Sequence, residues 1–301
     1  MARTGVAALI GNTPLVEIAK LNPRADRVAV YAKLEGRNPG GSVKDRPALA
    51  IVEEAEKRGD LPARTLLDAT SGNTGIAYAM LGAARGFAVE LCMPANASEE
   101  RKRILRAYGA KLVLTDPTEG QDGAIDEARA RAASDPDLYF YADQYANEAN
   151  PRAHYASTGP EIWRDTGGRV THFVAGLGTS GTAMGVGRFL KERDPSIRVL
   201  GMQPAGPFHG IEGLKHMETT AHVPPIYRPS ALDGLVPVAT ERAYALTRAL
   251  AREEGLFCGP SSGAALAAAL EVAAELTKGV IVTVLPDGGD RYLSTPVWDG
   301  A

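Results

Sequence analysis

The sequence predicts a two-domain α/β protein built on twisted, mostly parallel sheets. Short apolar runs alternate with segments of helical periodicity almost throughout the chain. The chain has 301 residues, which is long for one domain and typical for two. No internal repeat, low-complexity tract or block of like charge interrupts the alternation. Strands that alternate with helices are typical of parallel sheets covered on both faces.

The elements follow one another in a regular order. We expect strands at residues 28–34, 65–69, 89–93, 112–115, 171–175, 198–203 and 280–285. We expect helices after Lys44 and at residues 75–85, 98–108, 123–133, 181–193, 240–254 and 262–276. The segment 205–231, rich in Pro, Gly and His, lacks periodicity and is interpreted as a loop-like active-site flap. A domain boundary is expected near residues 145–152.

Composition and charge exclude several classes of protein. Apolar content of 45% and charged content of 23% are ordinary for a soluble globular protein. A net charge of −3 argues against a nucleic-acid or anionic-membrane surface. No signal-peptide pattern and no stretch of membrane-spanning length is present in the sequence. We therefore expect a soluble, cytoplasmic protein.

The cysteines and histidines give no metal-binding pattern. Cys92 and Cys258 lie far apart in the sequence without a CxxC motif, which favours a reducing compartment and no disulfide framework. The five histidines show no spacing typical of metal ligands. We expect no metal, and we expect Cys258 to fill a small buried apolar site.

The stretch 38–47 predicts a turn that leads into a helix. Gly40 and Gly41 permit backbone angles that other residues avoid. Ser42 is a good N-cap, and Asp45 three residues later suits a capping box. Pro47 fits the first turn of a helix.

Lys44 lies at the predicted start of this helix, and Gly59 is expected to end it. A cation is electrostatically disfavoured at a helix N-terminus, where acids are preferred. One interpretation is a solvated lysine. The other is a neutral amine that forms a Schiff base with pyridoxal phosphate.

Three further loops between a strand and a helix, or just before a helix, carry Gly, Ser and Thr. Loop 70–75 offers hydroxyls, an amide and backbone N–H groups, which suit a carboxylate, although a plain helix-capping loop has the same composition. Loop 176–182 adds small residues that let the backbone wrap a phosphate, although generic glycine packing is the alternative. It matches neither the Walker motif nor the dinucleotide fingerprint.

The last loop, 259–263, places a serine before an alanine-rich helix, where it caps the helix or binds a ligand. A lysine, a carboxylate site and a phosphate site together are what an amino-acid enzyme with pyridoxal phosphate requires.

These motifs resemble the cysteine synthase family (O-acetylserine sulfhydrylases). The matching stretches, in order, are 11–15, 39–47, 70–75, 178–182 and 259–263, so the resemblance covers nearly the whole chain. The short length, the Phe257-Cys258-Gly259 sequence and the ending at 289–295 are most similar to the cysteine synthase B branch. Glu148 stands where the family usually has proline.

The resemblance implies a role for each matching residue. Lys44 would form the internal aldimine, Asn73 would bind the phenolic oxygen of the cofactor, and Ser261 would face the pyridine nitrogen. The cofactor phosphate would be held by Gly178, Thr179, Ser180, Gly181 and Thr182. The substrate would be bound by Thr70, Ser71, Asn73, Thr74 and Gln144.

The resemblance also implies a fold of pyridoxal-phosphate fold type II, similar to the tryptophan synthase β subunit, with the cofactor in the interdomain cleft. A smaller, mobile N-terminal domain (1–12 and 35–147) would carry the substrate-carboxylate loop. A larger C-terminal domain (13–34 and 148–301) would carry the phosphate and pyridine contacts. By analogy we expect a homodimer, with Arg291 and Tyr292 tying the C-terminal tail near the active site.

The implied reaction is a β-replacement. Lys44 would remove the α-proton of O-acetyl-L-serine, acetate would leave to give an α-aminoacrylate, and sulfide or thiosulfate would add to form L-cysteine. A serine opposite the pyridine nitrogen keeps the ring neutral, which favours this elimination. Closure of the smaller domain would exclude water.

Several alternatives stay open. An O-phosphoserine-dependent synthase would need a cation near the leaving group, for which Lys215 is the candidate. A cystathionine β-synthase-like enzyme usually carries extra domains, and a serine or threonine dehydratase would not hold its intermediate for a second substrate. A catalytically silent partner of serine acetyltransferase is the non-enzyme alternative, against which the presence of Lys44, Asn73, Gln144 and Ser261 argues.

Overall fold

The computed structural model describes residues 5–70 and 72–299, so the predicted site residue Ser71 lies outside the described part of the chain. The chain divides into two compact units. The first comprises residues 1–10 and 38–150, and the second comprises residues 11–37 and 151–301. Each unit has a mostly or wholly parallel sheet, so the predicted α/β fold is confirmed.

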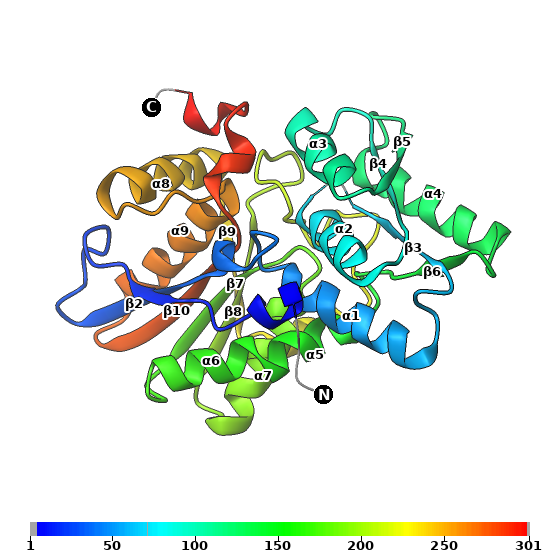
Figure 1. Cartoon of the computed structure of the whole chain (residues 1–301). Helices are drawn as coiled ribbons and strands as arrows, with labels where there is room; N and C mark the ends of the chain where they lie inside the picture. The colour runs from blue at the N-terminus through cyan, green and yellow to red at the C-terminus, as the bar shows by residue number, and fades with distance from the viewer. Residues whose placement is uncertain (1–4, 71, 300–301) are drawn as a thin grey trace. The chain divides into compact units, whose positions relative to one another are not determined.

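The first unit contains a four-stranded parallel sheet in the order β5-β4-β3-β6. Helices α1, α2 and α3 lie toward one face and α4 toward the other (Figure 1). Its strands are β3 (Thr65–Ala69), β4 (Val89–Pro94), β5 (Lys111–Thr115) and β6 (Tyr139–Tyr141). Its helices are α1 (Asp45–Arg58), α2 (Asn73–Arg85), α3 (Glu99–Ala107) and α4 (Gly120–Ser134).

Alternate residues of β3 show why this sheet is covered on both faces. Leu66 belongs to the core that includes residues of α1 and α2, whereas Leu67 belongs to the core beneath α4. Both side chains are fully buried. A strand that buries both faces reads as a continuous apolar run, as β3 and β4 do.

The second unit contains a six-stranded sheet in the order β1-β2-β10-β7-β8-β9. Only β1 is antiparallel to its neighbour. Its strands are β1 (Leu15–Glu17), β2 (Val28–Leu34), β7 (His172–Gly176), β8 (Arg198–Pro204), β9 (Gly234–Val238) and β10 (Gly279–Leu285).

Helices cover this sheet from both sides, with α8 and α9 toward one face and α6 and α7 toward the other (Figure 1). Their bounds are α6 (Thr158–Asp165), α7 (Gly181–Arg193), α8 (Thr240–Glu253) and α9 (Pro260–Glu275), and α5 (Ala149–Ala156) precedes them. Helix α9 is apolar nearly all round because it packs on both α8 and the sheet.

The seven predicted strands and seven predicted helices are all present, most of them within two residues of the expected bounds. Of the strands and α-helices in the described residues, five were not predicted: β1, β6, β9, α5 and α6. Strands β1 and β6 have three residues each, too few for a periodic signal. Proline obscured β9, an edge strand where proline is tolerated, and also the first turns of α5 and α6.

The segment 205–231 contains no α-helix or β-strand, as expected. Across the described residues, no helix combines the length and the apolar character needed to cross a bilayer.

Candidate active site

Lys44 is the residue that immediately precedes α1, and its side chain is partly buried. The Lys44 backbone N–H donates to Ser42 Oγ at 3.2 Å, and the Lys44 carbonyl accepts from Ala48 N–H at 3.0 Å. Gly59 ends the helix in the left-handed conformation (φ 80°), as predicted. The sequence therefore placed the lysine correctly at the helix start.

The expected capping box is wrong. Ser42 lies outside the cap position, which Lys44 itself occupies without a side-chain cap. The buried Asp45 carboxylate instead accepts the Gly40 N–H at 2.5 Å. A Cβ on Gly40 would lie 2.5 Å from Asp45 Oδ1, so glycine is required for this close approach. The turn is closed by Asp45, and this contact fixes the backbone that leads to Lys44.

The predicted carboxylate loop lies between β3 and α2. Gly72 N–H donates to Thr70 Oγ1 at 3.3 Å, and α2 begins at Asn73 without a side-chain cap. A Cβ on Gly75 would lie 2.9 Å from Leu91 Cδ1, so the first turn packs closely on β4. The uncapped helix start leaves backbone N–H groups for an anion.

Gln144 is brought to this loop from a distant part of the chain. Thr74 Oγ1 donates to Gln144 Oε1 at 2.6 Å, and Gln144 Nε2 donates to the carbonyl of Ala69 at 3.2 Å. The backbone of Gln144 is held by the carboxylate of Asp68 and by Asn150 Nδ2. From the local sequence Gln144 is expected to be an ordinary loop glutamine. In the structure it is only 4% exposed, and four hydrogen bonds hold it in place.

Glu148, where the family usually has proline, is exposed just before α5. The hydrogen bonds of Gln144 do not involve it. The substitution therefore leaves the Gln144 position intact.

The predicted phosphate loop lies between β7 and α7 in the second unit. Ser180 precedes α7 with φ 72° and without a side-chain cap hydrogen bond. Its Oγ is buried and has no hydrogen-bond partner within residues 5–70 and 72–299. A buried hydroxyl without a partner is costly, and a phosphate oxygen at the helix start would satisfy it.

Gly178 of the same loop is required by sterics. A Cβ there would lie 2.1 Å from the carbonyl oxygen of Gly213, in the segment 205–231. Lys215 N–H also donates to the carbonyl of Leu177 at 2.8 Å. The segment 205–231 thus packs against the predicted phosphate loop. The small residues of this loop and the buried Ser180 hydroxyl suit a phosphate such as that of pyridoxal phosphate.

Thr182 follows in the first turn of α7, beside His154. Thr182 Oγ1 lies 3.3 Å from His154 Nε2, and His154 Nδ1 lies 2.9 Å from Thr158 Oγ1. The buried imidazole connects α7 to α6 through two threonines. His154 therefore has a structural role, because its ring holds the two helices together.

Ser261 lies in the first turn of α9 and is buried, whereas Gly259 occupies the cap position. Ser262 N–H donates to the carbonyl of Gly259 at 2.9 Å. Ser261 is therefore not a helix cap, which was one of its two interpretations.

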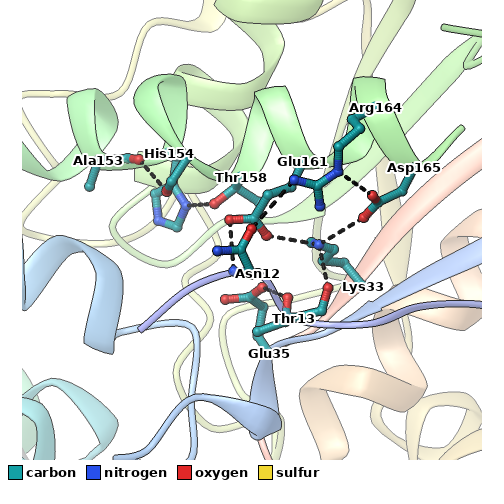
Figure 2. Close-up of polar contacts among 11 residues, drawn as sticks. Asn12, Thr13, Lys33, Glu35, Ala153, His154, Thr158, Glu161, Arg164 and Asp165 are labelled. Atoms are coloured by element: carbon teal, nitrogen blue, oxygen red, sulfur yellow. Dashed lines mark hydrogen bonds and ion pairs between the residues drawn. The ribbon is translucent and has the colours of Figure 1, made fainter. Parts of the chain in front are cut away.

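One cluster of the second unit was not predicted from the sequence. Lys33 of β2 is fully buried, with Nζ 2.8 Å from Glu161 Oε2, 3.3 Å from Asp165 Oδ2 and 2.5 Å from the carbonyl oxygen of Thr13 (Figure 2). Glu161 Oε1 also accepts the N–H of Asn12, whose φ is 47°. The cluster fastens the motif 11–15 to α6.

Helix α6 supplies these acids four residues apart, at 161 and 165, on one helix face. That spacing was the signal available in the sequence, but α6 itself was missed because of its early Gly-Pro pair.

The two cysteines and Tyr292 lie in surroundings that agree with roles in packing and in holding the C-terminal tail. Cys92 and Cys258 are free and buried, and burial raises the pKa of both thiols to about 12. Tyr292 donates to Asp287 Oδ2 at 2.6 Å and so ties the C-terminal tail to the residues after β10. Among the described residues no three His, Cys, Asp or Glu side chains are grouped to hold a metal ion.

Comparison with known proteins finds pyridoxal-phosphate enzymes and cysteine synthases that are similar over nearly the whole chain. The family model described as pyridoxal-phosphate dependent enzyme matches residues 6–287. The chain is 56% identical to a cysteine synthase of Aquifex aeolicus, over 99% of this chain and 93% of that protein. It is 48% identical to cysteine synthase B of Pseudomonas aeruginosa, over 98% of this chain and 97% of that protein.

A solved structure is similarly close. The crystal structure of a cysteine synthase from Entamoeba histolytica superposes with a TM-score of 0.92 at 38% identity, covering 98% of this chain and 90% of that chain.

Proposed function

Because the chain belongs to the family of pyridoxal-phosphate-dependent enzymes, we propose that it is a cysteine synthase, which makes L-cysteine from O-acetyl-L-serine and sulfide by β-replacement. The cofactor assignment rests mainly on the loop before α7. There the buried Ser180 hydroxyl, which has no partner in the described part of the chain, lies at a helix start without a side-chain cap. The likeness over nearly the full chain to proteins named cysteine synthase supports the substrates.

The cofactor would be held by residues of four segments. Lys44 would bind it covalently, Asn73 would donate to its phenolic oxygen, residues 178–182 would hold its phosphate, and Ser261 would face its pyridine nitrogen. When bound, pyridoxal phosphate supplies an electron sink that acidifies the α-hydrogen of an amino acid and lets a β-substituent leave. A serine hydroxyl carries no positive charge, so it leaves the pyridine nitrogen neutral.

The substrate carboxylate would be received by Thr70, Ser71 and Thr74 at the uncapped start of α2, with Asn73 and Gln144 beside them. Backbone N–H groups at a helix start favour an anion. The Lys44 amine, displaced by the substrate, would take the α-proton as a general base. Closure of the unit that carries this loop would exclude water from the reaction.

The leaving group and the sulfur donor separate this proposal from its rivals. An O-phosphoserine enzyme would use a cation such as Lys215, whose Nζ lies 3.1 Å from Thr220 Oγ1. Thiosulfate would replace sulfide without a change of site residues, and homocysteine would make the enzyme cystathionine β-synthase-like. A silent partner of serine acetyltransferase would turn over none of these compounds.

The assembly and location follow as part of the proposal. We expect a homodimer that works in the cytoplasm, where the two buried free thiols stay reduced. The smaller unit would carry the substrate-carboxylate loop and move, and the larger would carry the phosphate and pyridine contacts.

The experiment is a product assay on the purified holoenzyme with each donor in turn. With sulfide, O-acetyl-L-serine should yield L-cysteine at least about tenfold faster than O-phospho-L-serine does. Sulfide should also be preferred to homocysteine. A preference for O-phosphoserine or homocysteine would choose the corresponding rival, and no turnover of any pair would favour the silent partner. Lys44→Ala is the control, because it removes the proposed covalent attachment and base.

A further inference from the structure

Asp68 is a fully buried carboxylate at the end of β3, directly before the proposed carboxylate loop. Its Oδ1 accepts the N–H of Ala69 at 2.8 Å, and its Oδ2 accepts the N–H of Gln144 at 3.3 Å. Both carboxylate oxygens of Asp68 thus accept hydrogen bonds from backbone N–H groups. One donor, Ala69, ends the strand that leads into the loop, and the other, Gln144, extends its side chain to that loop.

The Gln144 backbone depends on such support. The preceding residue, Asp143, has φ 41°, a left-handed conformation that is unfavourable for a non-glycine residue. On the other side, the Gln144 carbonyl accepts from Asn150 Nδ2 at 2.9 Å. Asp68 and Asn150 therefore fix the peptide groups on both sides of Gln144, and its side chain is aimed at Thr74 and Ala69.

We propose that Asp68 is a positioning residue for the substrate-carboxylate site: it holds Gln144 against Thr74 and thereby sets the affinity for the amino-acid substrate. This inference rests on the proposed function, because it takes Thr74 and Gln144 as substrate-binding residues. Asp68 itself touches no substrate in this account, since it lies beneath the loop with its oxygens on Ala69 and Gln144.

The ionisation of Asp68 makes this role dependent on pH. Burial raises the pKa of Asp68, the nearby Asp143 raises it further, and the N–H groups of Ala69 and Gln144 lower it, which leaves the pKa at about 7. The titratable groups that interact with Asp68 are Cys92 from β4, Tyr78 from α2, Tyr141 from β6, and Asp143 and Tyr145 from the loop after β6. From α4, Asp122 acts on Tyr145.

Protonation weakens the hydrogen bonds that Asp68 accepts. An ionised carboxylate accepts charge-assisted hydrogen bonds from both backbone N–H groups, whereas in a neutral carboxyl one oxygen carries the proton and both oxygens accept more weakly. Asp68 therefore holds Gln144 more firmly, and the enzyme should bind its amino-acid substrate more tightly, as pH rises through about 7. A direct field effect has the opposite sign, because a negative Asp68 would repel the substrate carboxylate. Substrate affinity that rises with pH supports the positioning role, whereas affinity that falls with pH supports direct charge repulsion.

The test measures the dissociation constant of O-acetyl-L-serine, from the visible absorbance of the holoenzyme, between pH 6 and 8.5. At pH 8 Asp68→Asn should weaken binding about tenfold, as expected for one hydrogen bond to a charged group. At pH 6 the two proteins should agree, because the wild-type carboxyl is then neutral. The kcat at saturating substrate should change less than about threefold. Asp116→Asn, the same change at an exposed site of the same unit, should match the wild type throughout.

Asp143→Asn provides a second variant that keeps the carboxylate of Asp68. Asparagine tolerates the left-handed backbone at this position and keeps an oxygen for the Ala146 N–H. The change removes the charge of Asp143, which raises the pKa of Asp68, so the midpoint of the pH profile should move to lower pH. Equal affinity of Asp68→Asn and wild type at pH 8, tighter binding by Asp68→Asn, or an unmoved midpoint in Asp143→Asn would each overturn the inference. A wild-type protein that gives no response to O-acetyl-L-serine would instead overturn the proposed function.

Discussion

The hydroxyl of Thr74 donates a 2.6 Å hydrogen bond to the side-chain oxygen of Gln144, although 70 residues separate them in the sequence. The bond joins the first turn of α2 to the loop after β6. It is buried, and buried hydrogen bonds are costly to break when one partner stays behind. The two side chains that the family resemblance assigns to the same substrate are thus held together by the fold of the first unit.

Replacing Thr74 by valine should weaken substrate binding. The change removes the hydroxyl and leaves Gln144 Oε1 without this donor, which costs about 1–2 kcal/mol, or roughly tenfold in KM for O-acetyl-L-serine. Steady-state kinetics test it. The control is Thr118→Val, at an exposed threonine of the same unit, which should leave KM unchanged. An unchanged KM in Thr74→Val would remove Thr74 from the substrate site.

Changes in the phosphate loop should act on cofactor affinity. Ser180→Gly keeps the left-handed backbone but deletes the hydroxyl, so the dissociation constant for pyridoxal phosphate should rise about tenfold. Gly178→Ala should cost more, because its Cβ would lie 2.1 Å from the carbonyl oxygen of Gly213. Titration of apoprotein with cofactor measures both. Equal affinity of Ser180→Gly and wild type would show that this hydroxyl does not meet the phosphate.

The buried Lys33 cluster should make a large contribution to stability. Lys33→Met leaves Glu161 buried without its cation and should lower the free energy of unfolding by about 3–5 kcal/mol. Lys191→Met breaks a more exposed pair with Asp233 and should cost at most about 1 kcal/mol. Urea unfolding measures both. Adding Glu161→Gln to Lys33→Met should restore part of the loss, and no restoration would argue that packing, rather than charge, stabilises this site.

The pH dependence of stability should report Asp68. Its pKa rises on folding from 3.8 to about 7, so between these values the folded protein binds more protons than the unfolded chain. The Asp68 contribution is therefore fully present below pH 3.8 and is lost as pH rises to about 7. Three pH units correspond to at most about 4 kcal/mol.

Asp68→Asn should remove this slope, so unfolding free energies of variant and wild type should diverge in the variant's favour as pH rises from 4 to 7. The lost bond to Gln144 offsets part of that gain. A constant difference between the two proteins across this range would contradict the raised pKa.

The sequence predicted the parts of the fold with strong local signals. Strand β2 and helix α7 were predicted with the observed bounds, because a short apolar run and an amphipathic segment ended by charged residues are each visible within a dozen residues. Lys44 was placed correctly at the start of α1 for the same reason.

Contacts between distant segments were not predictable in this way. The expected cap at Ser42 does not form, and the buried Asp45 carboxylate instead accepts a hydrogen bond from the Gly40 N–H. Lys33, Glu161 and Asn12 are neighbours only in three dimensions, and Gln144 reads as a surface residue until Asp68 and Thr74 are known to hold it. The family resemblance, not the local sequence pattern, predicts a substrate-binding role for Gln144.

We propose that Lys44 carries pyridoxal phosphate on its side-chain amine. The most direct measurement is borohydride reduction of the purified protein, followed by protease digestion and mass spectrometry of the peptides. We expect a reduced cofactor adduct on Lys44 in the wild-type protein and no adduct at any site in Lys44→Ala. An unmodified Lys44 with the cofactor on another lysine, such as Lys215, or on none, would contradict it.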